Sequence, residues 1–152
     1  MRLFFLFFIS LLANTAFGQL PSKVEKLEGK WRFKEGSGYE VWEVKGDKIV
    51  GHAFRVLKTG DTSRVEDFFI ARVNKTLVYN LRTYTNINGQ LVTKERDFYS
   101  SKRKMKFVSL TEDLPYSIEF KFGFFNRNKL KILVQGDAHA SVEKFTLIRI
   151  KE

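Results

Sequence analysis

Residues 64–99 read RVEDFFIARVNKTLVYNLRTYTNINGQLVTKERDFY, and their pattern indicates the fold of the whole chain. They contain three runs in which apolar and polar residues alternate, rich in Val, Ile, Phe, Tyr and Thr, as in half-buried β-strands. The pairs Asn74-Lys75 and Asn88-Gly89 separate the runs. Asn-Gly is the strongest short signal for a two-residue type I′ turn. The stretch therefore predicts three antiparallel strands joined by tight hairpins.

These two turns also predict which residues face each other across the strands. With two-residue loops at both positions, Asp67 lies opposite Arg82, and Arg82 lies opposite Glu95. The three would form a charge row on one sheet face. An outward ladder is favoured, because exposed charge rows are common on barrel surfaces. In the inward alternative, Arg82 between two carboxylates would anchor a polar or carboxylate end of a ligand.

The same alternation continues through the rest of the chain from residue 30 onward and predicts an all-β protein. A short helical turn is expected at Pro21 to Leu27, and Gly46-Asp47 suits a type II′ hairpin. Nearly every link is a hairpin, so we predict an antiparallel up-and-down β-barrel of about ten strands, since closure removes exposed edges. A two-sheet sandwich with open edges is the alternative. The predicted strands are 30–35, 39–45, 48–57, 64–73, 76–85, 90–99, 104–111, 116–125, 129–135 and 141–150.

The phenylalanines indicate which strand faces are buried. Ile118, Phe120, Phe122 and Phe124 alternate along one side of the strand at 116–125. Such aromatic stripes are more often core than ligand site, so a packed interior is the first interpretation. The alternative is a cavity able to hold a small apolar molecule, as barrels of this size can.

The N-terminus has the pattern of an export signal. Met1-Arg2 is basic, residues 3–12 are apolar apart from Ser10, and Ala16 and Gly18 frame a small-residue cleavage site. We predict a signal peptide at 1–18 and one domain at 19–152, exported to the periplasm or the exterior and soluble after cleavage. Removal of 18 of the 152 residues leaves 134 and lowers the formal charge from +10 to +9.

Composition excludes several classes of site. The chain has no cysteine, which removes disulfides, thiolate metal sites and cysteine nucleophiles. Its two histidines, His52 and His139, are far apart in sequence and show no metal-ligand spacing, so we predict neither a metal nor a cofactor. His52 is expected to be hydrogen-bonded on a strand and His139 to be a solvated loop residue. No nucleophile elbow or phosphate-binding loop occurs.

The ends of the predicted barrel resemble a known superfamily. Leu27-Glu28-Gly29-Lys30-Trp31 opens the first strand, and Arg149 lies near the end of the last. This arrangement is similar to that of lipocalin-like (calycin) barrels, in which a Gly-x-Trp is capped by an Arg from the last strand. The resemblance implies that Arg149 stacks on Trp31 and closes one end of the barrel.

A closer resemblance is to an exported bacterial lipocalin-like family of unknown function. The matching pieces are Trp31, Glu40-x-Trp42, Gly51 after an apolar run, Asp67-Phe68 and Asp113-Leu114-Pro115. The last of these lacks the preceding His expected of that family. Because the family has no established activity, the resemblance implies a fold and no mechanism.

We therefore predict an exported, non-enzymatic binding protein for a small apolar or amphipathic molecule held inside the barrel. The hairpin register puts Trp42 opposite Gly51, away from the His52 face, so the candidates cannot all point inward without a bulge. An isomerase or hydrolase using interior carboxylates such as Glu40 and Asp67 ranks lower, since no motif joins a base to a nucleophile. The candidate ligand-binding residues are Trp42, His52, Phe54, Asp67, Phe68, Tyr79, Arg82, Glu95 and Phe120.

The charge balance suggests a surface partner as well. The 27 Lys and Arg residues outnumber the 17 Asp and Glu, and Lys102, Arg103, Lys104 and Lys106 form a basic run at a turn. Such a run is usually a solvated hairpin, but it could also contact anionic membrane components weakly. This gives an alternative function, a packed barrel that acts as a structural or interaction module. Export makes nucleic acid an improbable partner.

Overall fold

The computed structural model describes residues 19–100, 105–111, 115–137 and 139–151, which form one short helix and ten strands. The predicted signal peptide at 1–18, the basic residues 102–104 and the acidic-apolar pair at 113–114 lie outside the described residues. No helix among the described residues is long and apolar enough to cross a membrane. The elements are α1 (Ser22–Glu25), β1 (Gly29–Phe33), β2 (Gly38–Lys45), β3 (Lys48–Val56), β4 (Thr62–Val73), β5 (Thr76–Ile87), β6 (Gln90–Ser100), β7 (Lys106–Ser109), β8 (Ser117–Phe122), β9 (Lys129–Gln135) and β10 (Val142–Arg149).

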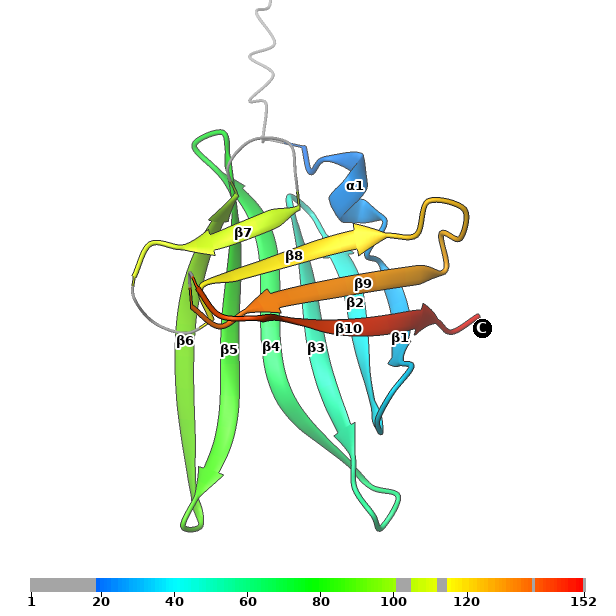
Figure 1. Cartoon of the computed structure of the whole chain (residues 1–152), viewed down its shortest axis with the longest axis vertical. Helices are drawn as coiled ribbons and strands as arrows, with labels where there is room; N and C mark the ends of the chain where they lie inside the picture. Colours follow the sequence, from blue (N-terminus) through cyan, green and yellow to red (C-terminus); the bar gives the residue numbers. More distant parts are fainter. Residues whose placement is uncertain (1–18, 101–104, 112–114, 138, 152) are drawn as a thin grey trace, which may run out of the picture.

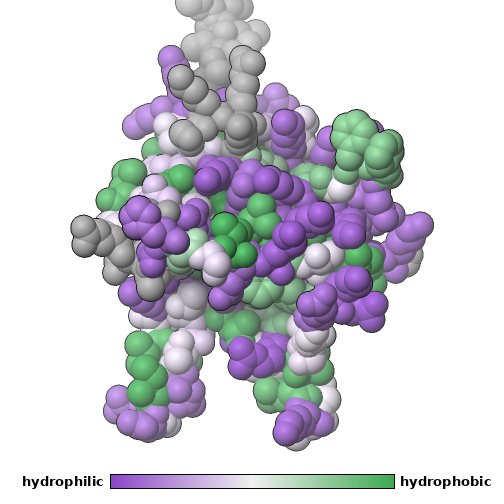
Figure 2. Space-filling model, in the orientation of Figure 1, coloured by the Kyte–Doolittle hydropathy of each residue, from purple (hydrophilic) through white to green (hydrophobic). Residues whose placement is uncertain are grey.

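The strands follow one another around a closed antiparallel barrel, and β10 pairs with β1 to complete it (Figure 1). The predicted barrel is confirmed, and the open sandwich is wrong. Closure satisfies the backbone groups that a free first or last strand would expose. Long hairpins β3–β4 and β5–β6 extend beyond the rest of the wall at the end away from α1 (Figures 1 and 2).

The tight turns have the predicted geometry. Asn74, Lys75, Asn88 and Gly89 all have positive φ angles, between 47° and 81°, as a type I′ turn requires. Gly46 has φ 64° and begins the two-residue loop between β2 and β3, in agreement with a type II′ turn. These turns fix the register, so Asp67 pairs with Arg82 and Arg82 with Glu95, as predicted.

One barrel end is closed by α1 and by a contact between the first and last strands. The Trp31 indole N–H donates to the Leu27 carbonyl at 2.7 Å, which ties the helix to β1. The Arg149 guanidinium lies 4.1 Å from the Trp31 ring centre and donates to the carbonyls of Glu28 and Lys26. The contact implied by the resemblance is thus present, and it satisfies carbonyls that the short helix leaves unpaired.

Several strand limits differ from the prediction by one or two residues, and three further differences are larger or change the position of a named residue. The helix begins after Pro21, which is its N-cap rather than its first helical residue. The predicted strand 104–111 is limited to β7, residues 106–109. The predicted strand 116–125 ends at Phe122, because the Gly123 amide bonds to the Lys129 carbonyl and the chain turns there. Phe124 therefore leaves the buried row and is 91% exposed.

Candidate binding site

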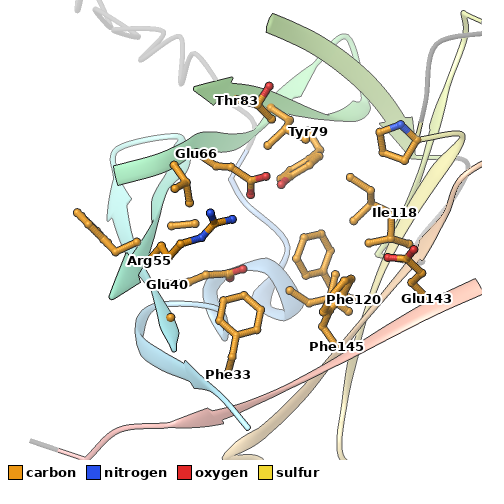
Figure 3. Close-up of a pocket in the computed structure, with 18 of the residues that line it drawn as sticks. Phe33, Glu40, Arg55, Glu66, Tyr79, Thr83, Ile118, Phe120, Glu143 and Phe145 are labelled. Carbon is orange, nitrogen blue, oxygen red and sulfur yellow. The ribbon is translucent and has the colours of Figure 1, made fainter. Parts of the chain in front are cut away.

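A cavity of about 610 Å³ is lined by residues from β1 to β6 and from β8 to β10. Glu35 and Ser37, from the connection between β1 and β2, border it. The wall formed by β8 to β10 is mostly apolar, and Figure 3 shows Ile118 and Phe120 on this side together with Glu143, facing the polar residues of β2 to β5. The apolar residues of the whole lining are Phe33, Ala53, Phe54, Val65, Leu81, Pro115, Ile118, Phe120, Ile132, Val134 and Phe145.

The opposite wall carries two carboxyl groups brought together by the strand register. Glu40 of β2 and Glu66 of β4 are both cross-strand partners of Ala53 in β3. Because Ala53 has only a methyl group, the two longer side chains have room to enter the cavity on either side of it. Figure 3 shows both carboxyl groups directed into the same space. Two residues along the strands, the same arrangement recurs, with the small residue Gly51 between Trp42 and Phe68. The ring centres of Trp42 and Phe68 lie 4.3 Å apart.

Burial controls the protonation of these carboxyl groups. Burial raises the pKa of Glu40 from 4.5 to about 7, partly opposed by a hydrogen bond from the Trp42 Nε1 at 2.9 Å and assisted by the charge of Glu66. The pKa of Glu66 is also raised by burial, and the positive charge of Arg55 works against this rise. A carboxyl group that titrates near neutral pH can exchange protons with a bound molecule.

Tyr79 and two arginines complete the polar lining. The pKa of Tyr79 is raised well above its usual range by burial and by the charges of Glu66 and Glu40, so its hydroxyl stays protonated. Arg55, from the end of β3, points into the cavity in Figure 3. Arg96 of β6 also lines it, and its buried Nε has no hydrogen-bond partner among the described residues.

The charge row of Asp67, Arg82 and Glu95 lies on the outer face of the barrel. Its strand neighbours Phe68 and Leu81 are buried inside, and successive side chains alternate between faces. The outward ladder is therefore the orientation adopted, and none of the three residues borders the cavity. Arg82 bonds to Glu95 at 2.8 Å.

Asp67 also takes part in a hydrogen-bond network on the outer face. The His52 Nδ1 lies 2.8 Å from Asp67 Oδ1, the Tyr84 hydroxyl donates to Oδ2 at 2.5 Å, and Arg64 donates to Oδ1 as well. Burial would raise the pKa of Asp67, but the hydrogen bonds from Arg64, Tyr84 and His52 outweigh it and lower that pKa. The predicted hydrogen-bonded His52 is confirmed. Asp67 is not one of the interior carboxylates.

The predicted aromatic residues divide between the cavity, the core and the outer face. Tyr79 and Phe120 line the cavity, whereas Trp42 and Phe68 are buried in the core and are not part of its lining. Phe54 borders the cavity, but its ring stacks on Tyr39 with ring centres 5.0 Å apart. His139 is an exposed loop residue, and the described part of the chain holds no cluster of metal-ligating side chains.

Glu66, Arg55 and Arg96 are cavity residues that sequence reasoning missed. The signal for Glu66 was available, since Phe68 pairs with Gly51 and Gly51 with Trp42. Counting two residues back from the buried Phe68 puts Glu66 on the inner face. Arg55 was harder to place, because the pairing of β3 and β4 shifts by one residue just after Ala53.

Comparison of the chain with protein-family models, with curated proteins and with solved structures gave no match. The closed antiparallel barrel is compatible with a lipocalin-like fold. Because a fold alone does not specify a function, the residues that line the cavity are the basis for inferring one.

Proposed function

We propose that the protein is an exported, non-enzymatic binding protein that holds a small amphipathic molecule in its barrel cavity. The single observation that carries this proposal is a cavity of about 610 Å³ with an apolar wall facing a polar one. Ligand sites have this character, being concave, largely apolar and fitted with a few polar groups that orient the ligand. The volume is within the range of sites for drug-sized molecules.

The acid–base alternative lacks a complete set of reacting groups. Glu40 could exchange a proton, but within the described part of the chain no serine, threonine or histidine side chain bonds to it, and its side-chain partner there is Trp42. A binding function therefore requires fewer chemical groups in the cavity than the mechanism of an isomerase or a hydrolase would.

Filling the cavity tests this function. N-phenyl-1-naphthylamine, a neutral probe that fluoresces in apolar sites, should bind the wild-type protein. Ala53→Phe and Val134→Phe, on opposite walls, should each weaken binding about tenfold or more, because the added ring occupies the cavity. Ala71→Phe is the matched control, since Ala71 follows the buried Ile70 and faces outward. Circular dichroism would verify that each variant is folded.

Unchanged probe affinity in both cavity variants would refute the proposal. Native mass spectrometry of protein purified from its own cells provides the complementary measurement. A copurified small molecule that is lost in Ala53→Phe supports the carrier, whereas a wild-type protein that is empty and does not bind the probe contradicts it.

A second candidate function is contact with an anionic membrane surface. The β8–β9 connection carries Phe124 and Phe125, 91% and 96% exposed, with ring centres 4.8 Å apart. Figure 2 shows an apolar projection where Figure 1 places this connection. Lys121, Arg127 and Lys129 flank it, and exposed aromatics among basic residues suit an anionic lipid interface.

Vesicle binding separates this loop from the basic run proposed from the sequence. Cosedimentation with phosphatidylglycerol vesicles at low salt should fall about tenfold for Phe124→Ser with Phe125→Ser if the aromatics insert. Replacing Lys102, Arg103, Lys104 and Lys106 by Gln should instead reduce binding if that run makes the contact, each residue near the surface contributing ~1 kcal/mol. Leu110→Ser, at another exposed apolar position, is the control. Binding unaffected by either change would exclude both surfaces.

A further inference from the structure

We infer that the polar end of the molecule held in the cavity is an organic cation, a protonated amine that pairs with Glu40 and Glu66. This inference rests on the proposed binding function and adds the chemical class of the ligand. It follows from the distribution of charge, from the unfilled hydrogen-bonding capacity of the polar wall and from the depth of the two carboxyl groups.

The charge of the cavity is opposite to that of the protein. The whole chain has 27 basic and 17 acidic residues. Among the described residues that line the cavity, the acidic side chains are Glu35, Glu40, Glu66 and Glu143, and the basic ones are Arg55 and Arg96. A strongly basic protein thus surrounds an acidic cavity, which favours a positively charged occupant.

The polar wall also has hydrogen-bond acceptors without donors. Glu40 is 5% exposed, and its one side-chain donor, the Trp42 Nε1, bonds to Oε2. No hydrogen bond from a described residue reaches Glu40 Oε1 or either oxygen of Glu66, and none of these oxygens is among the described atoms that are both fully buried and unpaired, so they stay open to the cavity. A carboxyl group buried without a donor or a cation is costly in its charged form. An ammonium group would supply both the positive charge and up to three N–H donors.

The arginines do not already serve this purpose. Arg55 acts electrostatically on Glu66, but it makes no ion pair of 4.0 Å or shorter with a described residue, and the pKa of Glu40 is set by burial, Trp42 and Glu66. The unpaired Nε of Arg96 favours an acceptor on the ligand, and by itself would select an anion. Arg96 pairs with Leu81 in the ladder, whereas Glu40 and Glu66 share Ala53, so Arg96 occupies a different part of the lining. Arg55 follows Ala53 by two residues on β3, and Figure 3 shows it on the same side of the cavity as the two carboxyl groups, so it also favours an acceptor on the ligand. The experiment must therefore compare both charges.

Octylamine, octanol and octanoate provide that comparison, because they share one apolar chain and differ in the polar end. Isothermal titration calorimetry at pH 8 should show octylamine binding at least tenfold more tightly than octanol, with octanoate weakest. Octanoate binding as tightly as octylamine would overturn the inference and assign the polar end to Arg55 and Arg96. If none of the three binds, the proposed binding function itself fails, which is a distinct result.

Acidification gives a second measurement. Pairing with the amine requires the ionised form of Glu40, whose pKa is about 7, so octylamine binding must release a proton at lower pH. Octylamine affinity should fall about 100-fold or more from pH 8 to pH 5, since the proton on Glu40 competes over the two units below its pKa. Protonation of Glu66, whose pKa is also raised by burial against the charge of Arg55, adds to this fall. Octanol affinity should change little. Tyr79 remains protonated throughout this range, so it does not contribute to the change.

Matched substitutions identify the groups responsible. Glu40→Gln and Glu66→Gln should each abolish most of the preference for octylamine over octanol while octanol still binds, because Gln keeps the side-chain length. Glu43→Gln is the control: Glu43 is on the same strand as Glu40 but exposed, where it pairs with Lys45. A preference that survives both cavity substitutions would overturn the inference. Retained octanol binding would exclude loss of folding as the explanation.

Discussion

Replacing Glu40 by Gln should change how the stability of the ligand-free protein depends on pH. The pKa of Glu40 is 4.5 when solvated and about 7 in the barrel, so the folded state binds the proton more tightly. The stabilisation from this proton is fully present below pH 4.5 and is lost as pH rises through about 7. At 1.36 kcal/mol for each pKa unit, the loss amounts to about 3 kcal/mol.

The assay is urea unfolding followed by tryptophan fluorescence, which reports on the buried Trp31 and Trp42. Wild-type protein, Glu40→Gln and Glu43→Gln would be compared at pH values from 4 to 8.5. Gln has no proton to lose, so the variant escapes the destabilisation that the wild type undergoes above pH 7. The unfolding free energy of Glu40→Gln relative to wild type should rise by about 3 kcal/mol across this range.

Parallel pH profiles for Glu40→Gln and wild type would refute the reasoning. They would mean that Glu40 is solvated in the folded protein, in contradiction to its burial beside Trp42. The control Glu43→Gln should follow the wild-type profile, because its side chain is exposed. Only the pH dependence is diagnostic, since the substitution also changes hydrogen bonding at every pH.

Three further outcomes follow from the packing. Arg149→Ala should lower the unfolding free energy by ~2 to 4 kcal/mol, because it leaves two carbonyls without a donor and removes the cation from Trp31; Arg149→Lys should recover only part of this loss in urea unfolding. Gly51→Ala should lower the melting temperature sharply, since its Cβ would come within 2.0 Å of Phe68 Cε2; an unchanged melting temperature would contradict this packing. Asp67→Asn should cost ~1 to 2 kcal/mol at pH 7. That cost should disappear in acid as wild-type Asp67 is protonated, because its lowered pKa makes its stabilisation present above pH 3.8 and lost below it.

Much of the fold could be predicted because its signals are local. The turn at Asn88-Gly89 requires positive φ angles that Asn and Gly tolerate, and a two-residue loop fixes the pairing of every residue in the flanking strands. The opposition of Asp67, Arg82 and Glu95 therefore needed no tertiary information. The capping of Trp31 by Arg149 could be anticipated only through the resemblance, because 117 residues separate the two in the chain.

The face of the charge row was less determined, because β4 carries acidic and aromatic residues on both sides. Glu66 and Phe68 occupy one face, and Asp67 and Phe69 occupy the other. The alternation of residues along β4 does not by itself show which face is buried. The packing of Phe68 over Gly51 and against Trp42 identifies the face that carries Phe68 as the inner one. Phe124 was misplaced for a similar reason, since its alternation continues beyond the point where backbone pairing ends.

The sequence by itself therefore determined the order of the strands, the tight turns and the cross-strand partners within the hairpins β2–β3, β4–β5 and β5–β6, because each depends on the period of the chain and the φ angles of a few turn residues. Only the tertiary structure decided that Glu40 and Glu66 share one cavity facing Ile118 and Phe120 from the far wall. A cavity is the volume left after strands distant in sequence have closed on each other and their side chains have packed. No local sequence pattern encodes the size or the lining of that volume. The cavity brings two carboxyl groups together in a space where burial controls their protonation.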